Sequence, residues 1–156
     1  MKELFPRLFI GSRDDYTTLP DKEKWVFVHA AASFFDKVKH DNLEKTKGFI
    51  ESKNELYLNW LDTPDETQFS VEQFNTAFHF IDFYLQNNEK KCLIHCDFGQ
   101  SRSASLVLFY LAKRTTILPN SFFPALKKFK ELYPDYVYPS GISRFIKKNW
   151  KVLDRK

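Results

Sequence analysis

The residues best suited to chemistry lie in one short segment, HCDFGQSRS at positions 95–103. It places the thiol of Cys96 six residues before the guanidinium of Arg102, with Gly99 between them. A thiolate is a strong nucleophile, and a guanidinium binds the oxygens of a phosphate group in a bidentate manner. The pattern therefore predicts a loop that binds an oxyanion and attacks it through sulfur.

The elements around this loop are predicted to aim it at one point. An apolar run at 91–95 precedes it and predicts a strand, and an apolar run at 104–112 follows and predicts a buried helix. A strand, a tight loop and a helix direct backbone N–H groups and a helix N-terminus at a single anion. Gly99 allows the backbone to approach that anion closely. The predicted phosphate-binding residues, most of them acting through backbone N–H groups, are Asp97, Phe98, Gly99, Gln100, Ser101 and Arg102.

The rest of the chain predicts an α/β architecture in a single domain, residues 1–156. Short apolar runs at 8–10, 25–29 and 56–61 predict further strands. Apolar residues at spacings of three and four predict helices over 71–87, 103–113, 121–134 and 139–153. The charged stretch at 36–55 predicts a loop with at most a short helix.

Composition narrows the class of protein. The net charge is +4, from 24 basic and 20 acidic residues, and this mild excess indicates a lysine-rich solvated surface. No arginine-rich stripe with interleaved aromatic residues is present, so nucleic acid is not the favoured partner. No signal peptide or membrane span is expected, and we expect a cytoplasmic protein, monomeric by default.

Cysteine and histidine positions argue against a disulfide and a metal site. Cys92 and Cys96 lie four apart in an extended run, roughly 13 Å from each other, too far for a disulfide. Cys92 is expected to be a core thiol. His29, His40 and His79 show no metal-ligand spacing. His95 is expected to hydrogen-bond nearby backbone and to orient the loop.

The segment with His95, Cys96, five intervening residues, Arg102 and Ser103 resembles the signature of the protein tyrosine phosphatase superfamily. The short chain and the run 101–103 are most similar to the dual-specificity branch. The similarity covers most of the chain. Residues 7–12 resemble the entry strand of these enzymes, and the four C-terminal helical segments follow in the expected order. It implies a central mixed, mostly parallel sheet flanked by helices, as in cysteine-based phosphatases.

The resemblance also implies roles for individual residues. Cys96 would attack phosphorus as a thiolate, and Arg102 would hold the phosphoryl oxygens. Ser103 would donate its hydroxyl to sulfur when the thiophosphate breaks, with a helix N-cap as its alternative role. The leaving group needs a proton from an acid after the third strand. Asp62 fits the strand register best, Asp65 is the alternate, and Glu66 is a further candidate.

These roles describe a dual-specificity protein phosphatase that forms a cysteinyl-phosphate intermediate and uses no cofactor or metal. Phosphotyrosine in proteins is the first expected substrate, with phosphoserine and phosphothreonine as further ones. Asp97 and Gln100 argue against phosphoinositides, because anionic head groups favour basic side chains in this loop. The alternatives are a phosphate-binding module with weak catalysis and an RNA 5′-phosphatase.

Overall fold

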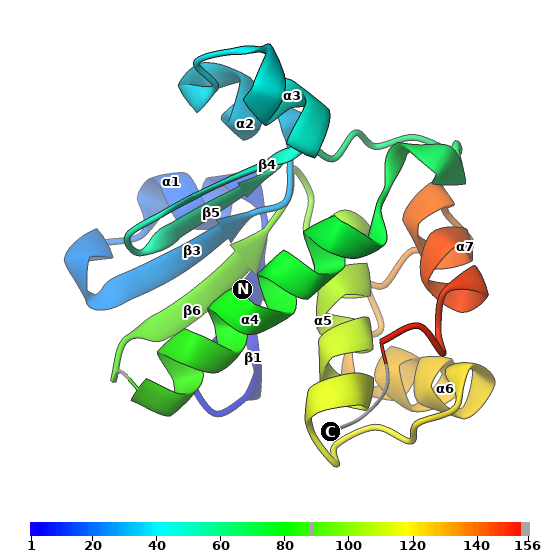
Figure 1. Ribbon diagram of the computed structural model, residues 1–156. Coiled ribbons are helices and arrows are strands. Elements are labelled where there is room, and N and C mark those ends of the chain that lie inside the picture. The colour runs from blue at the N-terminus through cyan, green and yellow to red at the C-terminus, as the bar shows by residue number, and fades with distance from the viewer. Residues whose placement is uncertain (88, 154–156) are drawn as a thin grey trace.

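The computed structural model describes residues 1–87 and 89–153, and its centre is a six-stranded sheet flanked by helices (Figure 1). The strands are β1 (Lys2–Phe5), β2 (Leu8–Gly11), β3 (Trp25–His29), β4 (Phe49–Ser52), β5 (Glu55–Leu58) and β6 (Lys91–His95). They follow the spatial order β1-β2-β6-β3-β5-β4. The four central strands run parallel, whereas β1 and β4 pair antiparallel at the edges. The expected mixed, mostly parallel sheet is confirmed.

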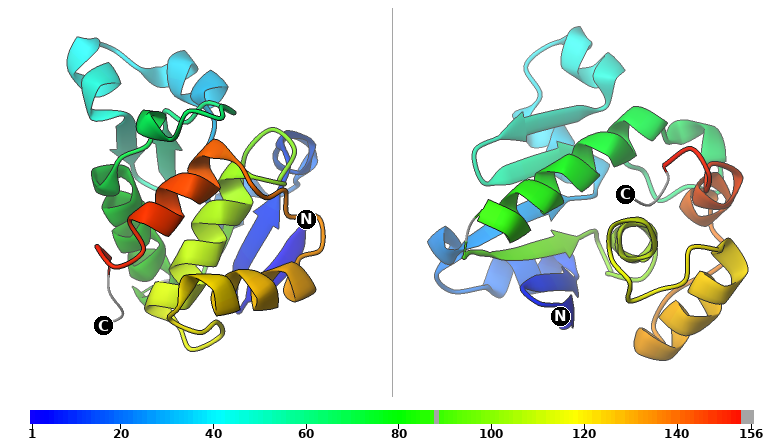
Figure 2. Two further views of the ribbon diagram at one scale, coloured as in Figure 1. Left: turned by 90° about the vertical axis from the view of Figure 1, so that its right-hand side faces the viewer. Right: turned by 60° about the horizontal axis from the view of Figure 1, so that its bottom comes forward.

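Helices cover both faces of the sheet (Figures 1 and 2). They are α1 (Arg13–Thr18), α2 (Ala32–Val38), α3 (Asn42–Lys47), α4 (Val71–Asn87), α5 (Arg102–Arg114), α6 (Phe122–Leu132) and α7 (Gly141–Lys148), with 3-10 turns η1 (Lys22–Lys24) and η2 (Glu66–Gln68). Helices α1 and α2 lie on one face, and α4 and α5 lie on the other. Helices α6 and α7 pack against α5, which the right-hand view of Figure 2 shows nearly end-on.

Successive side chains of the central strands point to opposite faces of the sheet, so they contribute to two apolar clusters, one on each face. Val28 and Ile94 belong to the cluster beneath α4 and α5, whereas Phe27 and Leu93 belong to the smaller cluster that includes Tyr16 of α1. All five residues of β3 are buried, as expected for a parallel strand covered on both faces. The carboxyl ends of β3 and β6 therefore emerge together between the two helical layers.

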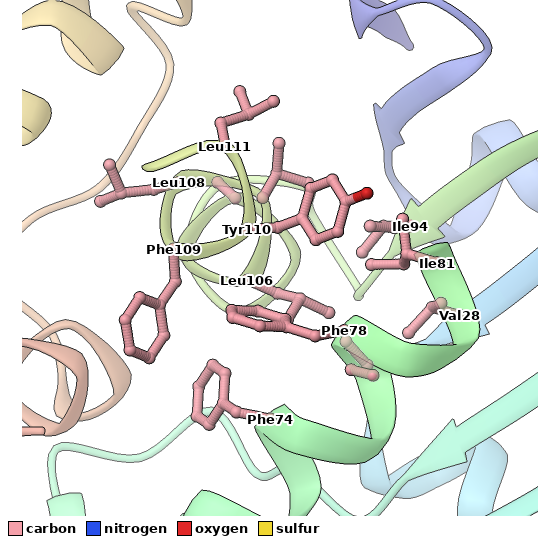
Figure 3. Close-up of a cluster of buried hydrophobic side chains, with 14 of the residues drawn as sticks. Val28, Phe74, Phe78, Ile81, Ile94, Leu106, Leu108, Phe109, Tyr110 and Leu111 are labelled. Carbon is pink, nitrogen blue, oxygen red and sulfur yellow. The ribbon is translucent and has the colours of Figure 1, made fainter. Parts of the chain in front are cut away.

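Helix α5 is buried along nearly its whole length, from Arg102 through Lys113. In Figure 3 its apolar side chains point outward in several directions, toward α4 and toward the sheet. The ring of Phe109 lies 5.4 Å from the rings of both Phe74 and Phe78 of α4, measured between centroids. Because the helix is packed on all sides, its first residue, Arg102, has a fixed position.

The prediction of a loop with a short helix over residues 36–55 was wrong in part: α3 is such a helix, but the region also contains the end of α2 and all of β4. Helix α3 buries no residue, so it lacks the apolar stripe that would have revealed it. Its ends are set locally: the Asp41 side chain accepts the backbone N–H of Glu44, and Gly48 ends the helix at φ 79°. Asn54, at φ 71°, then turns β4 into β5.

Other boundaries also differ from the prediction. Strand β1 and helix α1 were not predicted, and the third predicted strand ends at Leu58 rather than at residue 61. Beyond Leu58 the backbone turns, since the N–H of Trp60 bonds to the Leu58 carbonyl at 2.8 Å. The last helix, predicted over 139–153, is shorter: it begins at Gly141, where Ser140 and Ser143 form a capping box, and it ends at Lys148.

Candidate active site

The loop that the sequence singles out connects the end of β6 to the start of α5 and closes the carboxyl edge of the parallel strands. Parallel α/β sheets bind ligands at this edge, where loops and helix N-termini converge. A cavity of about 300 Å³ lies here. Its lining residues are Asp62, Thr63, Pro64, Cys96, Phe98, Gln100, Ser101, Arg102, Val137, Pro139, Ser140 and Gly141.

Cys96 follows the last residue of β6 and lines this cavity with only 2% of its surface exposed. Its Sγ lies 3.2 Å from the hydroxyl oxygen of Ser103, within hydrogen-bond distance for a sulfur atom. Ser103 lies inside α5, whose N-cap position is held by Ser101. The structure therefore brings Ser103 to the sulfur and does not give it the alternative role of helix cap.

Arg102 is 4% exposed, and its guanidinium is held from two sides. Nη1 donates to the backbone carbonyl of Trp60 at 3.0 Å, and Nη2 donates to a carboxylate oxygen of Asp97 at 2.9 Å. The planar guanidinium therefore lines the cavity in a fixed orientation, held by the neutral carbonyl of Trp60 and the charged carboxylate of Asp97.

The Asp97 side chain has a structural part that the sequence analysis missed, since its carboxylate was weighed only as a charge that disfavours phosphoinositides. Its second carboxylate oxygen accepts from Nη2 of Arg13 at 2.7 Å and from Nε of Arg13 at 3.1 Å. Burial raises the pKa of Asp97, but the hydrogen bonds from Arg102 and Arg13 outweigh this and hold the pKa below its ordinary value. No sequence signal points to Arg13, which α1 brings from 84 residues away.

Gly99 occupies the one conformation in the loop that demands glycine. Its φ of 74° lies in the left-handed region. A Cβ at this position would lie 2.8 Å from the carbonyl oxygen of Gly11 at the end of β2. The loop therefore packs backbone against backbone here, which brings it closer to β2 than any side chain would allow.

Two contacts from the chain after α6 fix the same loop. The hydroxyl of Tyr133 donates to the Gly99 carbonyl at 2.6 Å, and the N–H of Val137 donates to the Gln100 carbonyl at 2.7 Å. Burial, followed by the charge of Asp135, raises the pKa of Tyr133 to about 12, so its hydroxyl stays a donor at neutral pH. The sequence gives Tyr133 no role at this loop.

The candidate acids lie in different surroundings. Asp62 lines the cavity, and within residues 1–87 and 89–153 its carboxylate has no hydrogen-bond partner. Asp65 caps η2, where Thr67 and Gln68 donate to it and lower its pKa. Glu66 is turned away toward α7, where it pairs with Lys148 at 2.5 Å.

The loop that carries Asp62 is packed against the start of α7. A Cβ on Gly141 would lie 2.1 Å from the carbonyl oxygen of Thr63, so this contact is open only to glycine. The side chain of Arg144 also donates to the Pro64 carbonyl. These contacts fix the backbone that directly follows Asp62.

His95 is fully buried beneath the loop, with its Nδ1 3.3 Å from the carbonyl oxygen of Cys96. Its Nε2 lies 2.6 Å from Nδ1 of His29, whose Nε2 lies 3.0 Å from Glu55. The expected contact of His95 with backbone is present. The link to His29 and Glu55 was missed, because His29 was weighed only as a metal ligand.

The described residues contain neither a group of metal-binding side chains nor a helix able to span a membrane. Over the described ranges, 1–87 and 89–153, no three or more histidine, cysteine or acidic side chains form a group that could hold a metal ion. Among the same residues, none of the helices combines the length and apolar character needed to cross a membrane.

Comparison with known proteins places the chain among phosphatases. Residues 35–134 match the family model described as "Dual specificity phosphatase, catalytic domain". The dual specificity protein phosphatase YVH1 of Plasmodium falciparum (isolate 3D7) is 43% identical over 65 residues, which cover 42% of this chain and 11% of that relative. The chain thus spans about a tenth of the length of this relative.

Solved structures share the fold over almost the whole chain. The crystal structure of human DUSP28 superposes with a TM-score of 0.67 at 17% identity, covering 97% of this chain and 93% of that one. The crystal structure of DUSP15 gives a TM-score of 0.65 at 19% identity, with coverage of 96% and 86%.

Proposed function

The chain belongs to the family of dual specificity phosphatase catalytic domains, and from this premise we propose that it is a cysteine-dependent phosphate monoester hydrolase. The observation that carries the proposal is the convergence of Cys96, Arg102 and Asp62 on one cavity. These are a nucleophile, a bidentate phosphate ligand and an acid. Cys96 and Arg102 come from one loop and Asp62 comes from another, and all three line the same cavity.

In the first step the Cys96 thiolate attacks phosphorus, and the bond between phosphorus and the ester oxygen breaks. Arg102 binds two of the phosphoryl oxygens, and the loop N–H groups from Asp97 to Ser101 bind the developing negative charge. Asp62, as the acid, transfers its proton to the departing ester oxygen. The product is a cysteinyl phosphate.

In the second step water attacks the phosphorus of that intermediate, and the bond between phosphorus and sulfur breaks. Asp62, now a carboxylate, accepts a proton from the water. The hydroxyl of Ser103 donates a hydrogen bond to the departing sulfur as it becomes a thiolate, a role supported by the 3.2 Å between Oγ and Sγ. Inorganic phosphate leaves, and the thiolate is restored.

Asp62 is preferred over Asp65 as the acid because of what each carboxylate contacts. Asp62 lines the cavity that holds Cys96, whereas Asp65 is engaged by Thr67 and Gln68 in a local cap. A carboxylate whose pKa is lowered by such donors is also a poorer proton donor near neutral pH.

We assign phosphorylated proteins as substrates, with phosphotyrosine first and phosphoserine and phosphothreonine as further substrates. The rim supports an aryl ester: Phe98 is 74% exposed and Val137 is 46% exposed, and both line the cavity. An acidic residue in the loop, Asp97, opposes the highly anionic head groups of phosphoinositides.

Several wider assignments belong to the same proposal. We take residues 1–156 as one phosphatase domain, supported by a solved structure of this fold that covers 97% of the chain. A reducing, cytoplasmic location is supported by the free thiols of Cys92 and Cys96. We propose a monomer that acts without cofactor or metal.

A panel of substrates tests the function with the purified chain in the presence of a metal chelator. We expect hydrolysis of p-nitrophenyl phosphate and phosphotyrosine peptides, inhibition by vanadate, and weaker turnover of phosphoinositides. Binding of phosphopeptides without turnover would favour the phosphate-binding module instead. Preference for the 5′-triphosphate of RNA over phosphotyrosine would favour the RNA phosphatase.

A further inference from the structure

A continuous chain of polar groups runs from the protein surface to the backbone of the proposed nucleophile. It begins at Glu55 on β5, whose side chain is 33% exposed, and passes through His29 at the end of β3. It ends at His95, which is the register partner of His29 on the neighbouring strand β6. Both histidines are fully buried, so the two rings have no solvent to satisfy their nitrogens.

The number of protons available to Glu55, His29 and His95 limits their hydrogen bonds to two arrangements. A carbonyl oxygen only accepts, so a bond from His95 to the Cys96 carbonyl requires the proton on Nδ1 of His95. A neutral His95 then accepts at Nε2, and His29 must donate from Nδ1 across their 2.6 Å contact. The contact from Nε2 of His29 to Glu55 then needs a second proton, which makes the pair a histidinium and a carboxylate.

The other arrangement lacks that second proton. Neutral His29 donates from Nε2 to the carboxylate of Glu55 and accepts at Nδ1 from Nε2 of His95. The Nδ1 of His95 then carries a lone pair that faces the Cys96 carbonyl oxygen at 3.3 Å. Two acceptors in contact repel each other, so the loop loses one of its anchors.

We propose that Glu55 and His29 are positioning residues for the nucleophile loop, and that one proton shared by them sets the direction of all three hydrogen bonds. With this proton His95 donates to the carbonyl of Cys96, and without it His95 does not. The inference rests on the proposed role of Cys96, and it adds two residues that never touch the substrate.

Other groups face the two rings from every element packed on them. Tyr16 of α1 stacks on His95 at 5.0 Å, Phe34 of α2 stacks on His29 at 5.1 Å, and Tyr57 of β5 stacks on His29 at 4.5 Å. The charges behind these rings are Lys22 over Tyr16, Arg13 and Lys37 over Phe34, and Asp97 paired with Arg13. Glu55 is the acidic group bonded to the rings themselves.

Because of these surroundings, the proton shared by His29 and Glu55 is lost at a pH below neutrality. Burial lowers the pKa of His29, and the hydrogen bond to Glu55 offsets this only in part. Burial and the neighbouring His29 lower the pKa of His95 to about 3, so His95 stays neutral and serves as the link. The shared proton is therefore lost as pH rises through a value below about 6.5, the ordinary value for histidine. We expect the anchored loop, and the higher activity, on the acidic side of that value.

The substitution Glu55→Gln isolates this effect with little change in shape. Glutamine has no charge to share a proton with His29: its amide either donates to Nε2 of a neutral His29, so that His95 donates to the Cys96 carbonyl, or accepts from that nitrogen, so that His95 does not. In this variant the direction of the hydrogen bonds through His29 and His95 therefore no longer changes with pH. Glu51→Gln is the matched control, because Glu51 is an exposed acid on the adjacent strand β4 with the same change in charge.

The experiment compares kcat/KM for one aryl phosphate over the range from about pH 4 to about pH 7.5. Between these values we expect wild type and Glu51→Gln to lose about fivefold more activity than Glu55→Gln, the worth of one hydrogen bond. In parallel, ¹⁵N NMR of the histidine rings should show a proton on Nδ1 of His95 at the lower pH, and its transfer to Nε2 at the higher pH in wild type only.

The same pH dependence in wild type and Glu55→Gln would overturn the proposal, as would an His95 Nδ1 that is unprotonated throughout the wild-type titration. The NMR titration needs neither turnover nor a variant. A wild-type chain without phosphatase activity would count against the proposed function, while the spectra would still decide the hydrogen-bond direction.

Discussion

Two cysteines four residues apart show how one strand creates two different environments. Cys92 lies within β6 and is fully buried, and Cys96 lies just past its carboxyl end with 2% of its surface exposed. Accessibility hardly separates them, but their neighbours do. Cys92 is paired in register with Leu8 and Val26, and its burial raises its pKa to about 12.

Cys96 has polar and cationic neighbours instead. The hydroxyl of Ser103 lies beside its sulfur, Arg102 shares its cavity, and the N-terminus of α5 begins six residues later. Helix N-termini and cations stabilise a thiolate, whereas an apolar core stabilises a thiol. The comparison teaches that the end of a parallel strand, rather than exposure alone, decides whether its cysteine is suited to react.

Replacing each cysteine by serine gives the largest predicted difference between the two environments. Cys96→Ser should lower kcat for p-nitrophenyl phosphate by about 10⁴-fold or more, because the nucleophile is lost. Cys92→Ser makes the same atomic change but buries a hydroxyl, so it should lower the free energy of unfolding by about 1–3 kcal/mol and leave kcat nearly intact. Equal losses of activity in the two folded variants would contradict the distinction.

The cation of the Cys96 environment can be altered without removing its charge. Arg102→Lys should lower kcat by about 10²–10³-fold, because an ammonium group lacks the planar fork that binds two phosphoryl oxygens. Steady-state kinetics with p-nitrophenyl phosphate measures the effect. Arg114→Lys, a change at the far end of α5, is the control and should leave kcat unchanged.

The two aspartates after β5 form a second matched pair. Asp62→Asn should lower kcat by about 10²-fold for an alkyl phosphate, whose leaving group needs a proton. The loss should be much smaller for p-nitrophenyl phosphate, whose leaving group is stable as an anion. Asp65→Asn should change neither rate. Equal activity of both variants toward the alkyl ester would show that neither aspartate is the acid.

The smallest effect concerns the carboxylate beside Arg102. The pKa of Asp97 is lower in the folded protein, so its ionised form stabilises the fold above about pH 4, its unfolded value, and this contribution is lost as pH falls through the folded pKa. Its side chain is 33% exposed, so the contribution should be below ~1 kcal/mol. Urea unfolding at about pH 7 and about pH 3 should show a smaller drop in stability for Asp97→Asn than for wild type. An equal drop in both would contradict the expectation.

Sequence analysis located the nucleophile loop because its residues are contiguous. Nine adjacent residues and the apolar runs beside them were enough to place Cys96 and Arg102 between a strand and a buried helix. The strand register also favoured Asp62, which the structure brings to the cavity. The roles assigned to these residues stay predictions until the variants above are measured.

The features that sequence analysis missed depend on contacts between distant segments or on weak local patterns. Nothing near Tyr133 reveals that its hydroxyl reaches Gly99, and nothing near Glu55 reveals the two histidines behind it. Strand β4 and the bounds of helix α3 were missed because these elements bury few side chains. The spacing of apolar residues reflects which side chains are buried. An element that buries few side chains therefore shows no clear periodic pattern in the sequence.

The anchoring of the loop by Tyr133 and Val137 has a consequence for any attempt to shorten the chain. The family match ends at residue 134, yet Val137 and Gly141 line the cavity beyond that point. On the other side, Gly11 and Arg13 precede the match and also touch the loop. A fragment cut at the borders of the recognisable homology would keep every letter of the HCDFGQSRS signature while discarding part of the scaffold that gives those letters their geometry.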